Sequence, residues 1–257
     1  MAIKGEARCP VKCGLVHVTT ALQSLSKPAL LPWAVKQERL KIREAALNVL
    51  TNPDAKQLSP DDIWKAIESA TEGVSEAERI RKEAAEIGTT IHALIEAYLL
   101  NTLGKPGNPD VIALMVVDPP QVAIDAFNQF LIWSDSVDLR PLEIECHVQH
   151  DHYGYAGKFD LYGTVNGVPT IIDFKSSKAI WPESWLQLVA YREAALSMGM
   201  VAEQALIVRI PKVVDDPGIE AVLVPEEATI EHFLACLEMY KFQKLSKTTM
   251  AMPLSII

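Results

Sequence analysis

Two aspartates in the segment 154–177 have the type and spacing of residues that can share a divalent metal ion. Asn166-Gly167 is the preferred dipeptide for a two-residue type I′ hairpin turn. With that turn, the numbers of facing residues always add up to 333, which makes Asp160 and Asp173 a directly opposed pair. Opposed side chains on antiparallel strands have Cβ atoms roughly 4.5–5.5 Å apart. The sequence therefore predicts two carboxylates at one point of a β-hairpin.

A lysine joins the same predicted face. Lys175 lies two residues beyond Asp173 and projects to the same side, whereas Phe159 and Phe174 point to the other side. Opposed carboxylates repel each other, and a cation between them offsets the repulsion. A lysine does this in part, and a divalent metal ion does it better. The alternative is an ordinary solvated hairpin face on which an Asp–Asp pair is tolerated.

The segment 88–100, GTTIHALIEAYLL, carries a histidine on a predicted helix. His92 and Glu96 are four residues apart and share one helix face. Imidazole beside carboxylates suits Mn²⁺ and is tolerated by Mg²⁺. A lone helical histidine is more often a hydrogen-bonded surface or core residue. The helix itself is indicated by apolar residues at helical spacing, namely Ile91, Leu94, Ile95, Tyr98 and Leu99.

A later predicted helix carries a glutamine and a tyrosine. Pro182 marks its start and Gly199 lies past its end. Gln187 and Tyr191 are four residues apart and fall on one face. Such a pair is commonplace by itself. Its place in the chain, 12 residues after Lys175, links it to the hairpin.

Together these elements resemble the PD-(D/E)XK nuclease superfamily. The match consists of Asp160 followed by Asp173-x-Lys175 at the end of an apolar strand. The Gly-Thr-x-x-His-x-x-x-Glu string before the hairpin and the Gln-x-x-x-Tyr string after it are similar to the RecB-like branch. That branch includes phage recombination exonucleases, a mitochondrial DNA-maintenance exonuclease and the nuclease of CRISPR adaptation. The string KPALLPWAVK also resembles its N-terminal helical region, so the likeness covers nearly the whole chain.

The resemblance implies a role for each site residue. Lys175 would position or help deprotonate the attacking water, beside the catalytic carboxylates. Gln187 and Tyr191 would hold the lysine, the water or the DNA backbone in line. Glu96 would orient the histidine rather than bind a metal ion. One or two Mg²⁺ or Mn²⁺ ions would be held by His92, Asp160, Asp173 and the backbone carbonyl of Phe174.

The resemblance also implies an α/β (α+β) fold. We expect a restriction-endonuclease-like core with a central mixed β-sheet flanked by helices, and an N-terminal helical region. Residues 1–257 would form one nuclease domain, in which 1–110 are mainly helical and carry the histidine. Residues 111–257 would form the sheet-containing catalytic core. Further patterns predict strands at 142–149, 205–210 and 220–224, and helices at 19–50 (interrupted at Pro28 and Pro32), 120–134 and 226–245.

Other polar residues carry weaker signals. Glu143 and Glu145 alternate with apolar residues on the strand before the hairpin, and Glu145 is the better candidate to reach a metal ion from the strand edge, against simple exposure. Lys178 and Arg192 are candidates for contact with nucleic acid near the site. Basic residues also cluster near the end of the chain. That cluster is either a solvated helix face or part of a groove for a single strand or a duplex end: Lys241, Lys244 and Lys247.

Composition limits the class of protein. A chain of 257 residues with 49% hydrophobic content can bury one large core. No apolar run is long enough to span a membrane, and the N-terminus lacks a signal-peptide core. We therefore expect a cytoplasmic location, or the host cytoplasm for a phage-encoded protein. The net charge of −9 argues mildly against indiscriminate binding to nucleic acid.

The cysteines are too few and too scattered for a disulfide framework. Some relatives of the RecB-like branch hold an iron–sulfur cluster through four cysteines, three of them close together near the C-terminus. This chain has a single cysteine in that region, so no iron–sulfur cluster is expected and reduced buried thiols are the simplest interpretation. The alternative is a metal half-site at the first two of its four cysteines, which are Cys9, Cys13, Cys146 and Cys236.

The sequence thus favours a Mg²⁺- or Mn²⁺-dependent deoxyribonuclease. The expected type is an exonuclease or flap-type enzyme of recombination or repair, phage-related, acting on DNA ends or single strands. DNA and a recombination protein are its expected partners, and no membrane is involved. Two alternatives remain: a DNA-binding or scaffolding module that kept the fold without catalysis, and a site-specific endonuclease. The motifs carry no signal for the oligomeric state.

Overall fold

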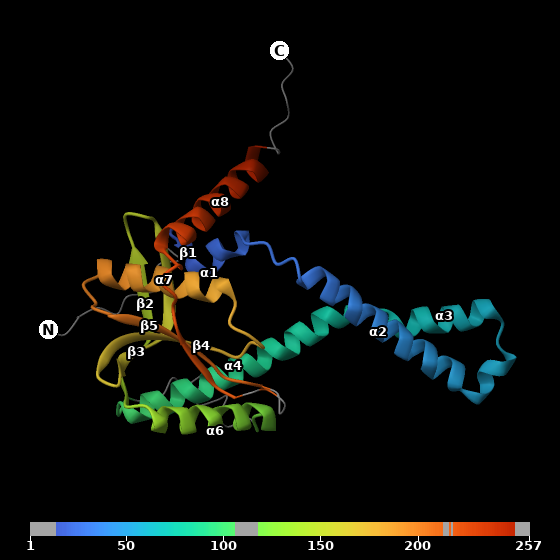
Figure 1. Ribbon diagram of the computed structural model, residues 1–257. Helices are drawn as coiled ribbons and strands as arrows, with labels where there is room; N and C mark the ends of the chain where they lie inside the picture. Colours follow the sequence, from blue (N-terminus) through green and yellow to red (C-terminus); the bar gives the residue numbers. More distant parts are fainter. Residues whose placement is uncertain (1–13, 106–117, 213–215, 217, 250–257) are drawn as a thin grey trace, which may run out of the picture. The chain divides into compact units, whose positions relative to one another are not determined.

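A computed structural model describes residues 14–105, 118–212, 216 and 218–249 (Figure 1). Contacts between residues divide the chain into two compact units. The first unit combines the residues up to Leu25 with those from Gly88 onward, and the second runs from Ser26 to Ile87. All candidate site residues belong to the first unit. The interpretation of residues 1–257 as one nuclease domain, with a boundary near residue 110, stays a prediction.

The second unit consists of helices. It contains α2 (Leu30–Thr51), the short 3-10 helix η3 (Pro53–Gln57), α3 (Pro60–Thr71) and the start of α4 (Glu76–Thr102). Ser59 accepts a hydrogen bond from the backbone N–H of Asp62, 3.2 Å away, which satisfies one free N–H at the start of α3. Pro32 does not interrupt α2 as expected, because it lies in the first turn, where a missing N–H costs nothing.

The sheet of the first unit has six strands in the described part of the chain. They are β1 (Val16–His17), β2 (Leu139–His150), β3 (Tyr155–Val165), β4 (Val168–Lys175), β5 (Gln204–Arg209) and β6 (Glu220–Leu223). The order is β1-β3-β4-β5-β6, and β2 pairs with β3. β1 with β3 and β4 with β5 are parallel pairs, and the other neighbours are antiparallel. The sheet is therefore mixed.

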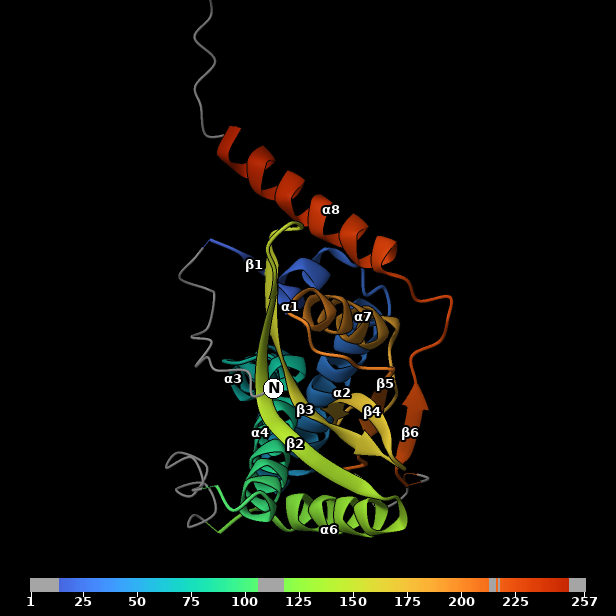
Figure 2. The ribbon, with the colours of Figure 1, turned by 90° about the vertical axis from the view of Figure 1, so that its left-hand side faces the viewer.

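Helices cover both faces of this sheet (Figures 1 and 2). On one face, α7 (Pro182–Ser197) packs with α1 (Val18–Ala21) and α8 (Ile230–Thr249). The core there includes fully buried Phe159, Leu188 and Phe233. On the other face, Phe130 of α6 (Gln121–Ser136) contacts the ring of Phe174 in β4, with ring centres 5.4 Å apart. The expected α/β class, a central mixed sheet flanked by helices, is confirmed.

The predicted hairpin register is confirmed where the two strands pair. Val165 pairs with Val168, and the ladder continues in the same register to Leu161 and Ile172. Asn166 has a positive φ of 51° and Gly167 one of 81°, as the type I′ turn requires. Asp160 and Asp173 are the next facing positions, just beyond the last recorded pair. The carboxylates thus lie where the strands begin to separate.

That separation makes a fork along one edge of β3. β4 pairs with residues 161–165, and β1 pairs with Tyr155 and Ala156. Between them, residues 157–160 have no strand partner on this edge among the residues that the structure describes. Side-chain alternation across the hairpin also ends here: the ring of Phe159 lies 6.0 Å from that of Tyr191 in α7, whereas Phe174 packs against α6. The prediction that both phenylalanines share one face was wrong, because the strands have separated.

The helix that carries His92, α4, is longer than predicted. Ser75 accepts a hydrogen bond from the backbone N–H of Glu78, 3.1 Å away, and the helix that begins there continues through Gly88 to Thr102. Gly88 therefore lies inside one 27-residue helix, instead of at the start of a helix over 88–100. Within the described residues, no helix combines the length and the apolar content needed to cross a membrane. Cys146 and Cys236 are free and buried, while Cys9 and Cys13 lie outside the described residues.

Candidate active site

The candidate site lies at the strand fork, where α4 and α7 each contribute side chains. β3 supplies Asp160, and the last three residues of β4 supply Asp173, Phe174 and Lys175. α4 brings His92 to the carboxylate of Asp160, and α7 brings a glutamine and a tyrosine to Lys175. The structure thus brings together side chains from four elements that the sequence analysis had singled out.

Lys175 is held by a chain of polar contacts. Its Nζ lies 2.5 Å from Asp173 Oδ2 and donates a hydrogen bond to Gln187 Oε1 at 3.0 Å. The amide nitrogen of Gln187 donates to the hydroxyl of Tyr191 at 2.9 Å, and reaches Asp173 Oδ1 at 3.4 Å. Because Gln187 offers one acceptor and one donor, it orients the ammonium group and the carboxylate at once. Tyr191 is 2% exposed, so the packing around its ring fixes this end of the contact chain.

Asp160 connects the two sides of the fork. Its Oδ2 accepts a hydrogen bond from the backbone N–H of Phe174 at 2.7 Å. Its Oδ1 lies 3.6 Å from His92 Nδ1, which is longer than a hydrogen bond but close enough for electrostatic attraction. The carboxylate therefore bridges β3 and β4 where their backbone ladder has ended. The imidazole of His92 also lies edge-on to the Phe174 ring, with ring centres 6.5 Å apart.

The two carboxylates have opposite pKa shifts. Burial raises the pKa of Asp173 to about 6, since it outweighs the nearby ammonium of Lys175, and the charge of Asp160 raises that pKa further. Burial also acts on Asp160, but His92, Lys175 and the N–H of Phe174 together lower the pKa of Asp160 below its usual value. A pair of carboxylates with diverging pKa values is a common feature of sites that handle protons.

The carboxylates of Asp160 and Asp173 also shift the pKa values of the basic groups beside them. Burial disfavours charged Lys175, yet the neighbouring Asp173 raises the pKa of this lysine above its usual value. The pKa of His92 is raised as well, because the carboxylates of Asp160 and Asp173 outweigh the effect of burial. The pKa of Tyr191 is raised by burial and by Asp173, so its hydroxyl stays protonated. In the metal-free protein, the site is therefore a balanced cluster of opposite charges.

A second ionic cluster borders Asp160. Glu145, a predicted metal ligand, forms an ion pair with Lys158, which the sequence analysis did not consider. Glu145 has a positive φ of 55°, a strained conformation for this residue type, and it lies opposite Asp160 between the pairs Ile144–Leu161 and Cys146–Phe159. Burial raises the pKa of Glu96, and Lys158 opposes that shift. The charge of Asp160 adds to the increase in the pKa of Glu96, and the charge of His92 opposes it.

The two predicted nucleic-acid contacts lie at the surface. Lys178 is an exposed residue in the otherwise half-buried loop after β4, and Arg192 is exposed on α7. Nothing in their surroundings assigns them a role, and their contact with nucleic acid stays a prediction.

Two further residues that the sequence analysis did not consider shape the site. A Cβ atom added to Gly157 would lie 2.3 Å from a ring carbon of Tyr191, so only glycine leaves room for the tyrosine in the fork. Arg209, 1% exposed, pairs in register with Lys175 and binds Asp216 through two hydrogen bonds of 2.6 and 2.8 Å. A lone glycine in a strand was the available signal for the first. Arginine at the end of an apolar strand was the signal for the second.

The donor types at the fork fit a hard divalent cation. They are two carboxylates and one imidazole, and Asp173 Oδ2 is buried without a well-directed hydrogen bond, despite its closeness to Lys175. In the described ranges, no three His, Cys, Asp or Glu side chains are gathered closely enough to hold a metal ion. Metal binding would therefore require His92, Asp160 and Asp173 to draw together, and Lys175 to release one oxygen.

Comparison with known proteins adds little at this point. No protein-family model matches the chain, and no curated protein matches it. Several solved structures are similar over part of their length, and two of them serve as examples. The protein SSO0001 has 15% identity and a TM-score of 0.32, covering 60% of this chain and 74% of its own. A candidate exonuclease from Eubacterium rectale has 12% identity and a TM-score of 0.44, covering 65% of this chain and 69% of its own. Similarity at this level assigns no activity.

Proposed function

We propose that this protein is a metal-dependent deoxyribonuclease of the PD-(D/E)XK type, RecB-like branch. The observation that supports it best is the contact chain from Asp173 through Lys175 and Gln187 to Tyr191, which faces Asp160 and His92 across one strand fork. Each motif is weak alone. Their meeting at one point is what a hydrolytic site would need, and it is not required by the hydrophobic pattern of the sheet.

The residues would divide the work of phosphodiester hydrolysis. His92, Asp160, Asp173 and the carbonyl of Phe174 would hold Mg²⁺ or Mn²⁺, whose chemistry at such sites is charge neutralisation on phosphate and acidification of water. Lys175 Nζ, fixed by Gln187 Oε1, places a positive charge beside the position where negative charge develops. The hydrogen bond to Gln187 keeps this ammonium beside α7 when it releases Asp173, which favours one geometry for attack.

The narrower proposal is an exonuclease or flap-type enzyme that acts on DNA ends or single strands in recombination or repair. Its support is the resemblance of the motifs alone. A phage-related origin, a recombination partner and a cytoplasmic location share that single support. A non-catalytic DNA-binding or scaffolding module with the same fold is the competing proposal.

A cleavage assay tests this proposal. Purified protein is incubated with end-labelled single-stranded and duplex DNA in the presence of Mg²⁺, Mn²⁺ or EDTA. We expect cleavage with either metal ion, none in EDTA, and none for Asp173→Asn. Stepwise shortening from one end supports an exonuclease, and discrete internal fragments support a site-specific endonuclease. DNA binding without cleavage by the wild type under all conditions would favour the non-catalytic module.

A further inference from the structure

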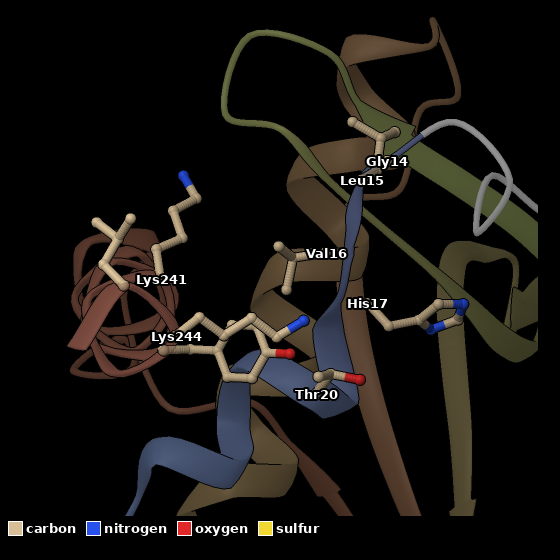
Figure 3. Close-up of a pocket in the computed structure, with 9 residues that line it drawn as sticks. Gly14, Leu15, Val16, His17, Thr20, Lys241 and Lys244 are labelled. Carbon is tan, nitrogen blue, oxygen red and sulfur yellow. The ribbon is translucent and has the colours of Figure 1, made fainter. Parts of the chain in front are cut away.

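A groove of about 630 Å³ lies between β1 and the last turns of α8, apart from the candidate active site (Figure 3). One wall is the segment Gly14–Thr20, and the other is formed by α8. Both walls belong to the first unit, in which α8 packs against α1 and α7. The volume is within the range of small-ligand sites, and the groove is open to solvent. The lining residues are Gly14, Leu15, Val16, His17, Thr20, Tyr240, Lys241, Lys244 and Leu245.

The α8 wall is cationic on a chain that is acidic as a whole. Lys241 and Lys244 are three residues apart, so their side chains leave the same side of the helix. Lys241 pairs with Glu238 at the surface, 2.7 Å apart, and an exposed pair of this kind opens at little cost. No acidic residue follows Glu238 in α8. With a net charge of −9 for the whole chain, a local pair of lysines in a groove selects for an anionic ligand.

The rest of the lining is apolar and aromatic. Leu15, Val16 and Leu245 offer hydrocarbon surface, and Tyr240 offers a half-buried ring. The ammonium of Lys244 lies over that ring, 5.3 Å from its centre, so a base stacks on this face once the ammonium turns from the ring to a phosphate. In Figure 3, Lys244 lies beside Thr20 at the lower end of the groove, and Lys241 projects above it.

We propose that this groove binds a segment of single-stranded DNA. Lysines beside an aromatic ring are the combination that holds a strand without sequence preference, with phosphates on the cations and a base on the ring. A duplex fits less well, because its base faces are stacked inside. A purely apolar ligand would leave the lysines unused, and a free anion would leave Tyr240 and the leucines unused.

The groove is linked to the candidate active site by one strand. β1 pairs with Tyr155 and Ala156, and Asp160 lies five residues after Tyr155 on β3. At about 3.3 Å per residue, that separation is roughly 17 Å, a few nucleotides of extended chain. The assignment of DNA rests on the proposed function. The groove would hold one end of a strand whose other part lies at the fork.

Binding is measured by fluorescence anisotropy in EDTA, so that no cleavage interferes. The probe is a fluorescein-labelled oligothymidylate of about 15 nucleotides. We expect Lys241→Glu/Lys244→Glu to weaken binding about tenfold. The slope of the logarithm of the binding constant against the logarithm of the salt concentration should become shallower by roughly 0.7 for each lost phosphate contact. Tyr240→Ala should weaken binding about tenfold through lost stacking, whereas Tyr240→Phe should bind as the wild type does.

The matched control is Lys65→Glu/Lys82→Glu, which changes the net charge by the same amount at two exposed helical lysines of the second unit. Equal binding by the groove variant and this control would overturn the inference. So would equal competition by a duplex of the same length, or by the mononucleotide, because either would show that no strand is recognised. Circular dichroism confirms that each variant is folded.

The experiment separates this inference from the proposed function. If the wild type cleaves DNA and the groove variant binds like the control, the groove assignment fails and the nuclease stands. If the wild type never cleaves DNA, but the groove variant loses binding, the nuclease fails and the groove assignment stands.

Discussion

The ammonium group of Lys175 contacts two side chains, Asp173 and Gln187, in different ways. It balances the charge of Asp173, and it is held in place by Gln187. A protonated amine has no lone pair to donate, so it cannot itself bind a metal ion. Its contribution to a reaction and the contribution of the metal ligands can therefore be separated by mutation.

Lys175→Ala should keep metal binding and lose cleavage by at least about 10²-fold, which is typical of a lost acid–base or charge-stabilising group. His92→Ala should differ, because it removes one ligand. Excess Mn²⁺ should restore part of its activity. Cleavage rates and metal-induced shifts in melting temperature are measured for both variants. Wild-type cleavage by Lys175→Ala would contradict the proposed mechanism.

At the residue scale, the sequence predicts which side chains meet but not all of their partners. The gathering of His92 with Asp160 and Lys175 was expected from the resemblance of the motifs to a known nuclease family, whereas periodicity only placed His92 on a helix. The ion pair between Glu145 and Lys158 was not expected, and neither was the positive φ at Glu145, which no local residue preference predicts. Side-chain contacts between neighbouring strands depend on such backbone irregularities, which periodic sequence patterns do not predict.

The strand fork is the element that makes the site possible. Had β3 and β4 stayed paired through Asp160, alternation would have placed the carboxylates on a regular sheet face. Instead, Tyr191 lies against Gly157 on β3, and the Asp160 side chain connects to β4. The missing side chain of Gly157 is what admits the tyrosine ring.

Gly157→Ala should therefore destabilise the protein by about 1–3 kcal/mol, the usual cost of overpacking, because the buried Tyr191 ring cannot move aside. In a Tyr191→Ala background, the same substitution should cost much less, since the space is then free. Urea unfolding of the wild type, the two single variants and the double variant gives the coupling free energy between positions 157 and 191. Purely additive effects would show that the tyrosine is not the obstacle.

Regular elements were predicted well, and their interruptions were not. The type I′ turn determined the hairpin register, apolar spacing located α6 and the helix that carries His92, and Pro182 and Gly199 marked the ends of α7. The two-residue strand β1 was missed, because so short a segment carries no periodicity. The continuity of α4 through Gly88 was missed as well. A helical glycine there is explained by close packing: an added Cβ would lie 2.8 Å from Ser176 Oγ.

For the whole molecule, the buried charges tie stability to pH. Asp173 and His92 both have a raised pKa in the folded, metal-free protein. The stability that each contributes is fully present below its unfolded pKa, 3.8 or 6.5, and is lost as the pH rises through the folded value. Asp160, with its lowered pKa, contributes stability that is lost only as the pH falls below about 4.

A metal ion at the fork would compete with these protons. We expect Mn²⁺ at about 100 times its Kd to stabilise the protein at pH 8 by roughly 2.7 kcal/mol, and to have little effect at pH 5, where Asp173 and His92 carry protons. Melting curves with and without Mn²⁺ at each pH provide the measurement. The Asp173→Asn variant should show no shift at either pH. Equal shifts for the wild type at pH 5 and pH 8 would contradict metal binding by these two residues.

The backbone N–H of Phe174 is sensitive to the state of the Asp160 carboxylate, to which it is hydrogen-bonded. It donates a 2.7 Å bond to Asp160 Oδ2, and short bonds to ionised acceptors are the strong ones. An amide proton in such a bond resonates far downfield and exchanges slowly with deuterium. Its NMR signal would therefore change whenever the Asp160 carboxylate binds a cation or turns away. One assigned peak in a ¹⁵N-labelled sample would thus record occupancy of the site without any substrate.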